Sequence, residues 1–497
     1  MDHPFNTSAT LSAFGRYKDV TNLEELIEFS EKPLRKCLRV NTLKMNVDDF
    51  NVYAAQHQWK LDPVLWCSEG FFIDRPSPSG LRPASRIPLG KDLLHMLGHT
   101  YMQEASSMLP VALLDPRPGD KVLDMAAAPG SKSTQIAALM KGEGVLIAND
   151  MQQARIHTLI TALNRLGVTN VRVTKKVGQW FAKNMTARFD RVLIDAPCTG
   201  QGTCRKDSTA LTYCSEHSIG KNAKLQRELL EAAIHATKIG GRIVYSTCTL
   251  TPEENEDVVI SVLQKFEGQV EVVDPRELKV ENGKWKINQA IEDSFLVQEY
   301  LKKNLQSSIS NFPFLRIWPQ TYNTEGFFCA VLEKMAPTKD IEKVDAVRSH
   351  EEWMPKARKA DLQSFLHERF GAQLIGDDEV LLQNKERVWV TNEETLKFPL
   401  ACPHVCIGLP LGKLLDKSPV RLDHDFVTLR GARALENILE VSDEQWNTLM
   451  SGQDIDCPEE YLGHILLKYQ GMCVGRGRAK DGRLKNHLPR WMIQLSS

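Results

Sequence analysis

The 497-residue sequence lacks any long apolar run, and this absence argues against an integral membrane protein. No stretch approaches the roughly 18 consecutive apolar residues that cross a bilayer. The first six residues, MDHPFN, also lack the basic and apolar regions of a secretory signal, so we expect a cytoplasmic protein.

A surplus of charge is missing too, because 62 Lys and Arg residues face 63 Asp and Glu residues. Phosphate binding is largely the work of Lys and Arg, so the balance argues weakly against a nucleic-acid partner. Net charge is a sum over the whole chain and hides local patches. The balance therefore leaves such a partner possible.

The 11 cysteines contain no Cys-x-x-Cys pair, which leaves little support for a structural zinc site or a thioredoxin-like motif. Cys402, His404 and Cys406 offer three ligands, but no second cluster completes a set of four. We therefore expect no metal. In a reducing compartment most of these cysteines are expected to be small buried hydrophobic residues.

The length predicts roughly three domains at ~100–200 residues each. A hydrophobic fraction of 42% with 25% charged residues is typical of a globular protein. The middle third alternates apolar strands with helices, and Gly240-Gly241 is expected to close the third helix. Predicted strands cover 121–125, 145–148, 171–173, 191–194, 242–246 and 327–332, and predicted helices cover 131–140, 152–166, 225–237 and a segment from Pro252. This alternation predicts an α/β fold with a mostly parallel, doubly wound sheet.

Less regular regions flank this core. Residues 1–105 mix helix and strand, with a predicted strand at 37–40. Residues 334–359 are rich in Lys, Glu and Pro and indicate a linker or a surface helix. From about Cys402 the chain shows short β-like runs separated by Gly and Pro.

A turn with small residues, DMAAAPGSK at 124–132, follows the first core strand and opens a helix. Small side chains let a ligand approach the backbone, and the helix start offers free N–H donors. Asp150, twenty positions after Gly130, ends the second strand, where a carboxylate can accept hydrogen bonds from both hydroxyls of a ribose. The turn matches neither the dinucleotide fingerprint nor the P-loop, which disfavours NAD and ATP. An ordinary strand–turn–helix connection is the alternative interpretation.

Two cysteines follow two other core strands, Cys198 just after Asp195 and Cys248 after the strand at 242–246. Ligands bind beyond the carboxyl ends of the strands in open α/β sheets, so both thiols and Asp195 are expected at the same rim. A thiolate that adds to carbon 6 of a pyrimidine makes carbon 5 able to accept an electrophilic methyl group. A carboxyl group at N3 would stabilise the charge that this addition develops.

These motifs together resemble the RNA 5-methylcytosine methyltransferases of the Nol/Nop/Sun family. Beside the segments above, the matches include RVNTL at 39–43, QEASS at 103–107 and YSTCT at 245–249, within a span of residues 34–333. The resemblance implies a Rossmann-like class I methyltransferase core with S-adenosylmethionine as cofactor. It implies that Cys248 is the nucleophile, that Cys198 serves product release, and that Asp195 contacts the base. The implied cofactor-binding residues are Ala126, Ala127, Ala128, Pro129, Gly130, Ser131, Lys132, Asp150 and Asp195.

One position departs from the family pattern. Val177 stands where the family usually has an aspartate that meets the adenine side of the cofactor. What replaces this contact is open. Arg205 and Lys206, in the loop after Cys198, are candidates to reach RNA phosphate, and a solvated charged loop is the alternative.

The chain ends in a basic stretch. Between residues 468 and 490, seven Lys and Arg residues face one aspartate, a local net charge of seven minus one, or +6. With the preceding GHILL at 463–467, the stretch resembles a PUA-type RNA-binding domain. Such a domain behind the core is similar to a bacterial subgroup of the family that modifies cytosine 1407 of 16S ribosomal RNA.

The resemblance divides the chain into four parts: an N-terminal α+β RNA-binding subdomain at 1–105, the methyltransferase core at 106–335, a linker and small intermediate domain at 336–400, and a β-rich PUA-like domain at 401–497. The expected partner is 16S rRNA within the small ribosomal subunit, bound by a monomer without membrane or metal. Three alternatives stay open: another rRNA site or a tRNA as substrate, an amino-group methyltransferase on the same fold, and a non-catalytic assembly factor. The thiol in place of a polar-Pro-Pro-aromatic loop disfavours the second, and the intact cysteines disfavour the third.

Overall fold

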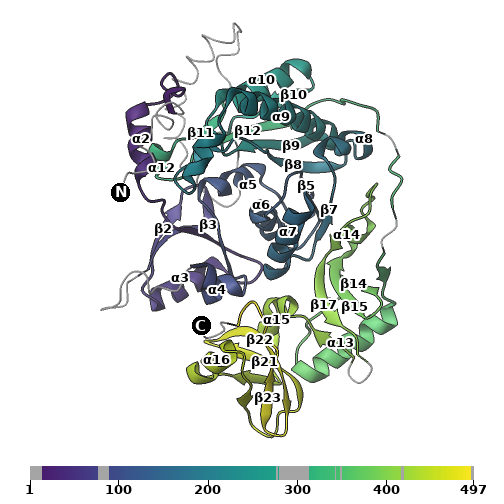
Figure 1. Cartoon of the computed structure of the whole chain (residues 1–497). Helices are drawn as coiled ribbons and strands as arrows, with labels where there is room; N and C mark the ends of the chain where they lie inside the picture. The colour runs from purple at the N-terminus through teal and green to yellow at the C-terminus, as the bar shows by residue number, and fades with distance from the viewer. Residues whose placement is uncertain are drawn as a thin grey trace.

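The computed structural model describes residues 14–75, 89–275, 278, 313–341, 343–347, 350–415 and 419–493. The chain start, on which the absence of a secretory signal was argued, lies outside these residues. Four sheets are present (Figure 1): an N-terminal four-stranded sheet, a nine-stranded core sheet and two C-terminal five-stranded sheets. The predicted fold class, a Rossmann-like core between an α+β subdomain and a β-rich C-terminal region, is confirmed.

The core sheet has the strand order β10-β12-β9-β8-β5-β6-β7-β16, and β11 pairs with β12. The five strands from β9 to β7 run parallel, while β12 and β16 add antiparallel edges. The strand bounds are Lys121–Asp124 (β5), Val145–Asn149 (β6), Val171–Thr174 (β7), Phe189–Asp195 (β8), Thr237–Thr247 (β9), Val270–Val272 (β10), Leu315–Ile317 (β11), Phe327–Lys334 (β12) and Cys406–Ile407 (β16).

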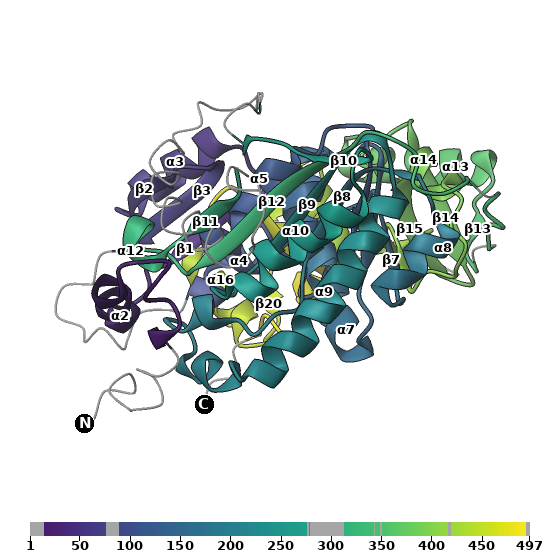
Figure 2. The same ribbon diagram turned by 90° about the horizontal axis from the view of Figure 1, so that it is seen from above.

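Helices cover both faces of this sheet and bury one apolar cluster on each face. Figure 2 shows α9 and α10 lying together along one of these faces. The helix bounds are Leu109–Leu114 (α5), Ser131–Leu139 (α6), Gln153–Arg165 (α7), Phe181–Asn184 (α8), Glu216–Ala236 (α9) and Glu256–Lys265 (α10), with a 3₁₀ turn at Pro252–Glu254. In the ranges that the structure describes, no helix is long and apolar enough to cross a membrane.

Two predicted boundaries in the core are wrong. Helix α9 begins at Glu216 and not at Leu225, because Ser215 caps it by accepting a hydrogen bond from the Ser218 amide. Its first turns are polar and gave no apolar periodicity to detect. Gly240 and Gly241 do not close α9, since they lie inside β9, where a side chain on Gly241 would meet the Asp190 carbonyl oxygen at 2.8 Å.

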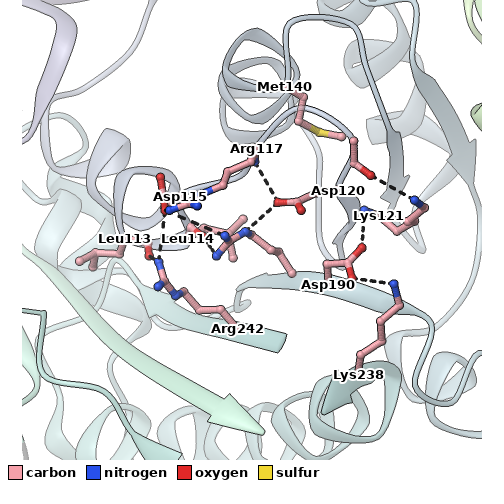
Figure 3. Close-up of polar contacts among 12 residues, drawn as sticks. Leu113, Leu114, Asp115, Arg117, Asp120, Lys121, Met140, Asp190, Lys238 and Arg242 are labelled. Atoms are coloured by element: carbon pink, nitrogen blue, oxygen red, sulfur yellow. Dashed lines mark hydrogen bonds and ion pairs between the residues drawn. The ribbon is translucent and has the colours of Figure 1, made fainter. Parts of the chain in front are cut away.

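Ionic contacts tie the amino ends of β5, β8 and β9 together (Figure 3). The Asp190 carboxylate accepts from the Lys121 amide at 2.8 Å and from the Lys238 ammonium at 2.6 Å. Asp120 accepts from the Arg117 amide at 2.9 Å and from the Arg191 guanidinium at 2.8 Å. This end of the sheet is closed by structural ion pairs, which leaves the carboxyl ends of the strands for a site.

The N-terminal sheet has the order β2-β3-β1-β4 and is antiparallel throughout. Its strands are Cys37–Val40 (β1), Lys60–Val64 (β2), Cys67–Asp74 (β3) and Thr100–Met102 (β4), and its helices are Leu23–Glu31 (α2), Val47–Gln56 (α3) and Leu93–Met96 (α4). Arg39 of β1 is fully buried and donates to the Gln103 side chain and to Thr134 of α6, each at 3.0 Å. The two N-terminal sequence motifs therefore meet at the helix that follows the small-residue turn.

The C-terminal half forms two sheets, of order β13-β14-β15-β17-β18 and β19-β21-β22-β23-β20. Their strands are Glu352–Trp353 (β13), Glu379–Asn384 (β14), Arg387–Asn392 (β15), Leu409–Lys413 (β17), Arg421–Leu422 (β18), Ile438–Glu440 (β19), Ile455–Asp456 (β20), Gly463–Tyr469 (β21), Met472–Lys480 (β22) and Arg483–Asn486 (β23). Helix α13 (Lys356–Phe370) packs on the first sheet, and α15 (His424–Arg430) and α16 (Asp443–Met450) accompany the second.

The boundary predicted at residue 400 falls between β15 and β17, which pair with each other. The predicted linker at 334–359 contains β13 and the start of α13.

A buried ion pair holds β11 against α10. The Arg316 guanidinium donates to both carboxylate oxygens of Glu256 at 2.6 Å and to the Leu250 carbonyl oxygen at 2.7 Å. The two side chains are 4% and 1% exposed. Leu250 lies two residues beyond Cys248, so this pair also fixes the loop that follows β9.

We expect Arg316→Ala to lower the free energy of unfolding by about 3–5 kcal/mol, because it leaves the Glu256 carboxylate buried and unpaired. Urea denaturation followed by tryptophan fluorescence measures the change. Lys265→Ala is the matched control: it breaks the Lys265–Glu231 pair, whose side chains are 58% and 29% exposed, and is expected to cost less than about 1 kcal/mol. Equal unfolding midpoints for the two variants would contradict this role of Arg316.

Candidate active site

Two thiols meet at the carboxyl ends of neighbouring parallel strands. Cys198 lies three residues after β8 and Cys248 directly follows β9, and their sulfur atoms are 3.4 Å apart. Both side chains are half-buried. The strands β8 and β9 pair in parallel up to Asp195 and Ser246, which brings the two strand ends to the same height. The structure thus places the two predicted catalytic cysteines in contact.

The contact with Cys248 affects the protonation of Cys198. The hydrogen bond with Cys248 is the largest of the effects that raise the pKa of Cys198 well above its ordinary value, and burial and the charge of Cys248 add to it. Cys198 is therefore a protonated thiol at neutral pH that can donate to the Cys248 sulfur.

Backbone hydrogen bonds tie the two cysteine loops to a third segment. The Gly202 amide donates to the Cys248 carbonyl oxygen at 2.9 Å, and the Gly326 amide donates to the Gly202 carbonyl oxygen at 2.9 Å. A side chain on Gly202 would meet the carbonyl oxygens of Gly326 at 2.3 Å and of Cys248 at 2.6 Å. Only glycine permits this approach.

A buried carboxylate, that of Glu254, accepts hydrogen bonds from the loop that carries Cys198. Glu254 is inaccessible to solvent and accepts hydrogen bonds from the Thr199 amide at 2.9 Å, the Thr199 hydroxyl and the Gln226 amide at 3.1 Å. Burial raises the pKa of Glu254, and the bonds from Thr199 and Gln226 oppose that rise. Sequence reasoning missed Glu254 because an acidic residue after Pro252 is typical of an exposed first helical turn.

Asp195 is the last residue of β8 and is paired with Lys132 of α6. The Lys132 ammonium lies 2.7 Å from one Asp195 oxygen and 3.0 Å from the Ser107 hydroxyl, and the Ser246 hydroxyl donates to the other Asp195 oxygen at 3.0 Å. Burial lowers the pKa of Lys132, but its attraction to Asp195 prevails and the pKa is raised. Lys132 is thus a fixed cation that orients the Asp195 carboxylate.

The small-residue turn leads from β5 into α6 and offers groups that suit a nucleoside. Asp124 at the end of β5 accepts from the Ser133 hydroxyl at 2.6 Å, while its second oxygen is buried without a partner in the described part of the chain. Asp150 accepts from the amides of Ala128 at 3.3 Å and Gln152 at 2.8 Å. A side chain on Gly130 would meet the Ala162 side chain at 3.1 Å, so this glycine also serves helix packing.

Two apolar side chains flank the same rim. Met151 follows β6 and is 59% exposed, and Val177 follows β7 and is 52% exposed. Asn149 holds the Val177 loop by exchanging hydrogen bonds of 2.9 Å with the Lys176 backbone. In place of the usual aspartate this loop presents apolar surface, which suits the face of an adenine. The donor set, the unpartnered Asp124 oxygen and this surface together fit S-adenosylmethionine.

A cavity of about 380 Å³ opens beside Cys198. It is lined by Cys198, Thr199 and four residues of the first two turns of α9: His217, Ser218, Lys221 and Asn222. Sequence reasoning missed these residues because it started α9 at Leu225. Their polar and basic side chains suit a polar ligand next to the thiols.

Two other candidate residues, Arg205 and His404, make contacts away from the two thiols. Arg205 donates to the backbone carbonyl oxygens of Lys32, Pro33 and Thr324, which favours a structural role over a phosphate contact. His404 binds the Arg172 guanidinium at 3.2 Å and the Glu351 carboxylate at 2.9 Å through its two ring nitrogens. Within the described ranges, no group of three or more His, Cys, Asp or Glu residues is placed to hold a metal ion.

Three family models match the chain. The model described as 16S rRNA methyltransferase RsmB/F matches residues 111–333. The N-terminal domain of 16S rRNA methyltransferase RsmF matches residues 16–105, and the methyltransferase RsmF PUA domain matches residues 436–494.

Similar proteins extend over almost the whole chain. The ribosomal RNA small subunit methyltransferase F of Vibrio parahaemolyticus is 35% identical over 487 residues, which cover 95% of this chain and 94% of that protein. The protein of the same name from Vibrio cholerae is 35% identical over 484 residues, with coverage of 96% and 95%. Among solved structures, a methyltransferase homolog from Pyrococcus horikoshii is 32% identical with a TM-score of 0.53, over 66% of this chain and 100% of that chain. NSun6 from the same organism, solved with SFG, shares the fold with a TM-score of 0.52 at 23% identity, over 65% of this chain and 98% of that chain.

The contact between the thiols makes a prediction about pH dependence. Cys248→Ala removes the hydrogen bond that raises the pKa of Cys198, so we expect that pKa to fall and the thiolate fraction at pH 8–9 to rise several-fold. Alkylation by iodoacetamide as a function of pH, with the Cys198 peptide quantified by mass spectrometry, measures the shift. The half-buried Cys457 serves as internal control, because it lies in the C-terminal sheet region. An unchanged pH profile for Cys198 would show that the 3.4 Å contact does not control its protonation.

Proposed function

Because the chain belongs to the RsmB/F family of 16S rRNA methyltransferases, we propose that it transfers a methyl group from S-adenosylmethionine to carbon 5 of a cytosine in 16S rRNA. The proposed intermediate is a covalent bond between Cys248 and carbon 6 of that cytosine. The observation that carries this proposal is the 3.4 Å contact between the sulfur atoms of Cys198 and Cys248, next to Asp195.

The first step is the attack of the Cys248 thiolate on carbon 6. A new S–C bond forms, and the displaced electron pair makes carbon 5 nucleophilic. The Asp195 carboxyl group, held by Lys132 and Ser246, is placed to contact N3, and in its protonated form it can donate that proton to N3 as negative charge develops on the ring. In this proposal Lys132 is a positioning residue that acts through Asp195.

Release of the product requires loss of the proton from carbon 5. Once the Cys248 sulfur is bonded to carbon 6 it carries no charge, so its hydrogen bond to Cys198 is weakened and its charge no longer raises the pKa of Cys198, while burial still does. Cys198 then ionises more readily, and its thiolate can take the carbon 5 proton. As that proton leaves, the bond between Cys248 and carbon 6 breaks and the sulfur recovers its electron pair.

The cofactor supplies the electrophilic methyl group when it is bound. We propose that the turn of Ala126 to Lys132 surrounds it, that Asp150 binds its ribose, and that Asp124 accepts a hydrogen bond with its unpartnered oxygen. Met151 and Val177 offer apolar surface for the adenine. The contact usually made by an aspartate at position 177 is replaced here by packing.

The proposed substrate is cytosine 1407 of 16S rRNA, unstacked so that its ring reaches Cys248. The related proteins named as small subunit methyltransferase F support the rRNA substrate. We assign RNA contacts to the N-terminal part at 1–105 and to the PUA-like part at 401–497. On β22 and β23, the side chains of Arg478, Lys480, Arg483 and Lys485 are exposed, which suits a phosphate-facing surface.

Trapping of the covalent intermediate tests this mechanism. With Cys198→Ala, attack by Cys248 proceeds while release fails, so a protein–RNA adduct that survives denaturing electrophoresis should accumulate. Cys248→Ala should form no adduct and lose methyl transfer by at least about 10³-fold, since the nucleophile is gone. RNA affinity of Cys248→Ala should stay within about twofold of wild type.

Two controls accompany this experiment. The double variant Cys198→Ala/Cys248→Ala should form no adduct. Bisulfite sequencing of 16S rRNA treated with the wild-type chain should show protection at cytosine 1407. An adduct that forms with tRNA but not with rRNA would identify tRNA as the substrate. Methyl transfer at the wild-type rate by Cys248→Ala would overturn the mechanism.

A further inference from the structure

A second cavity lies far along the chain from the cysteines, where the two C-terminal sheets meet. It has a volume of about 400 Å³ and is lined on one side by α13 and β18 and on the other by β21 and β22. Four of its lining residues are basic or polar: Arg369, His464, Arg476 and Arg478. The others are mostly apolar and include Phe365 and Leu422. Figure 1 shows the two sheets beside each other below the core.

Strand pairing explains why the cavity joins charge to apolar surface. Leu466 of β21 is directly opposite Arg476 of β22, and His464 is opposite Arg478, which in turn is opposite Lys485 of β23. Directly paired residues point to the same face of a sheet. At the Leu466 end this face is buried against the neighbouring sheet, and at the Arg478 end it is exposed. The cavity lies where the buried part of this face meets its exposed part.

Among the residues that the structure describes, the guanidinium groups at this border have no carboxylate partner. Arg369 donates to the backbone carbonyl oxygens of His464 and Leu462, and Arg476 contacts the His487 ring at 2.8 Å. In the part of the chain that the structure describes, no carboxylate lies within 4 Å of the guanidinium nitrogens of Arg369, Arg476 or Arg478. The nearby Asp423 is paired with Arg387, and its charge also attracts Arg476 from beyond 4 Å. Burial, and then repulsion by Arg421, lower the pKa of Arg476 to about 10.

Polar atoms at the cavity also lack partners. The Nε of Arg476 and the Nδ1 of His464 are buried and make no hydrogen bond with any described residue. Buried polar groups are nearly always satisfied, so such atoms indicate a ligand. Guanidinium groups that converge without a carboxylate match the geometry of phosphate oxygens.

We propose that this cavity binds one nucleotide unit, with its phosphate on Arg476 and Arg478 and its base against the apolar wall that contains Phe365. The unit belongs either to the RNA strand or to a free nucleotide, and both share this chemistry. The RNA source rests on the proposed function, whereas the free nucleotide does not. The cavity volume, above 300 Å³, is in the range that holds a small organic ligand.

Binding of cytidine 5′-monophosphate to the full chain tests the proposal by calorimetry. Arg478→Gln should weaken binding about tenfold, as expected for the loss of one charge-assisted contact. Arg358→Gln is the matched control, because Arg358 is exposed on the first turn of α13 but does not line the cavity, and it should change affinity less than twofold. Phe365→Leu keeps an apolar side chain and should weaken binding of the nucleotide but not of inorganic phosphate.

The same variants are then compared on a 16S rRNA fragment. A selective loss of RNA affinity in Arg478→Gln, with KM for RNA raised and kcat unchanged, identifies the RNA strand as the source. Loss of nucleotide binding with unchanged RNA affinity identifies a free nucleotide. The proposal is overturned if the wild-type chain binds no nucleotide and Arg478→Gln affects RNA binding no more than Arg358→Gln. Nucleotide binding is independent of methyl transfer and should persist in Cys248→Ala, so a failure here is separable from a failure of the proposed function.

Discussion

The hydrogen bond from the Gly202 amide to the Cys248 carbonyl oxygen is the contact on which the arrangement of the two thiols depends. It joins the loop after β8 to the loop after β9, and the Gly326 amide extends it to the segment before β12. The position of Cys198 is fixed through its neighbour Thr199, and that of Cys248 through its own carbonyl group. The 3.4 Å contact between the two sulfur atoms therefore rests on loops whose backbones are already joined by hydrogen bonds. Preorganisation of this kind lowers the cost of reaching the transition state.

The Glu254 carboxylate beneath these loops is buried, and a network of hydrogen bonds offsets the free-energy cost of that burial. Glu254 and the side chains around it are buried, and a carboxylate in a low-dielectric interior is expensive unless its oxygens are hydrogen-bonded. Thr199 and Gln226 provide those bonds, while the Glu254 carbonyl oxygen accepts from the Tyr245 hydroxyl at 2.6 Å. Because every member is tied to another, loss of one bond would leave a buried partner unsatisfied. Such a network fixes a single loop conformation, which suits two thiols that must remain in contact.

The sequence predicted features that depend on local pattern and missed those that depend on distant contacts. Apolar runs predicted the parallel strands. The rule that ligands bind at the carboxyl ends of such strands predicted that Asp195, Cys198 and Cys248 lie at one rim. The polar start of α9 has no apolar period, so the cavity residues His217 and Lys221 were missed. Lys132 was predicted as a cofactor residue, yet it pairs with Asp195, 63 positions away, and spacing cannot reveal such a contact. Glu254 was missed for the same reason, because its burial is decided by Thr199 and Gln226.

The chain is nearly neutral overall, although its C-terminal stretch is basic. Contacts between the C-terminal half and the core hold that stretch in place. Strand β16 adds to the core sheet beside β7, so the C-terminal half is continuous with the sheet that carries the cysteines. Lys44, half-buried, donates to the carbonyl oxygens of Leu97 and Arg165 and to the Thr428 hydroxyl, and so joins the N-terminal part, the core and α15. Burial lowers the pKa of Lys44 to about 7, but a neutral amine can still donate to these oxygens. The basic face of β22 and β23 is thereby held at a set distance from Cys248. If that face binds RNA phosphates, as proposed, its position relative to Cys248 determines which nucleotide of the strand reaches the thiols.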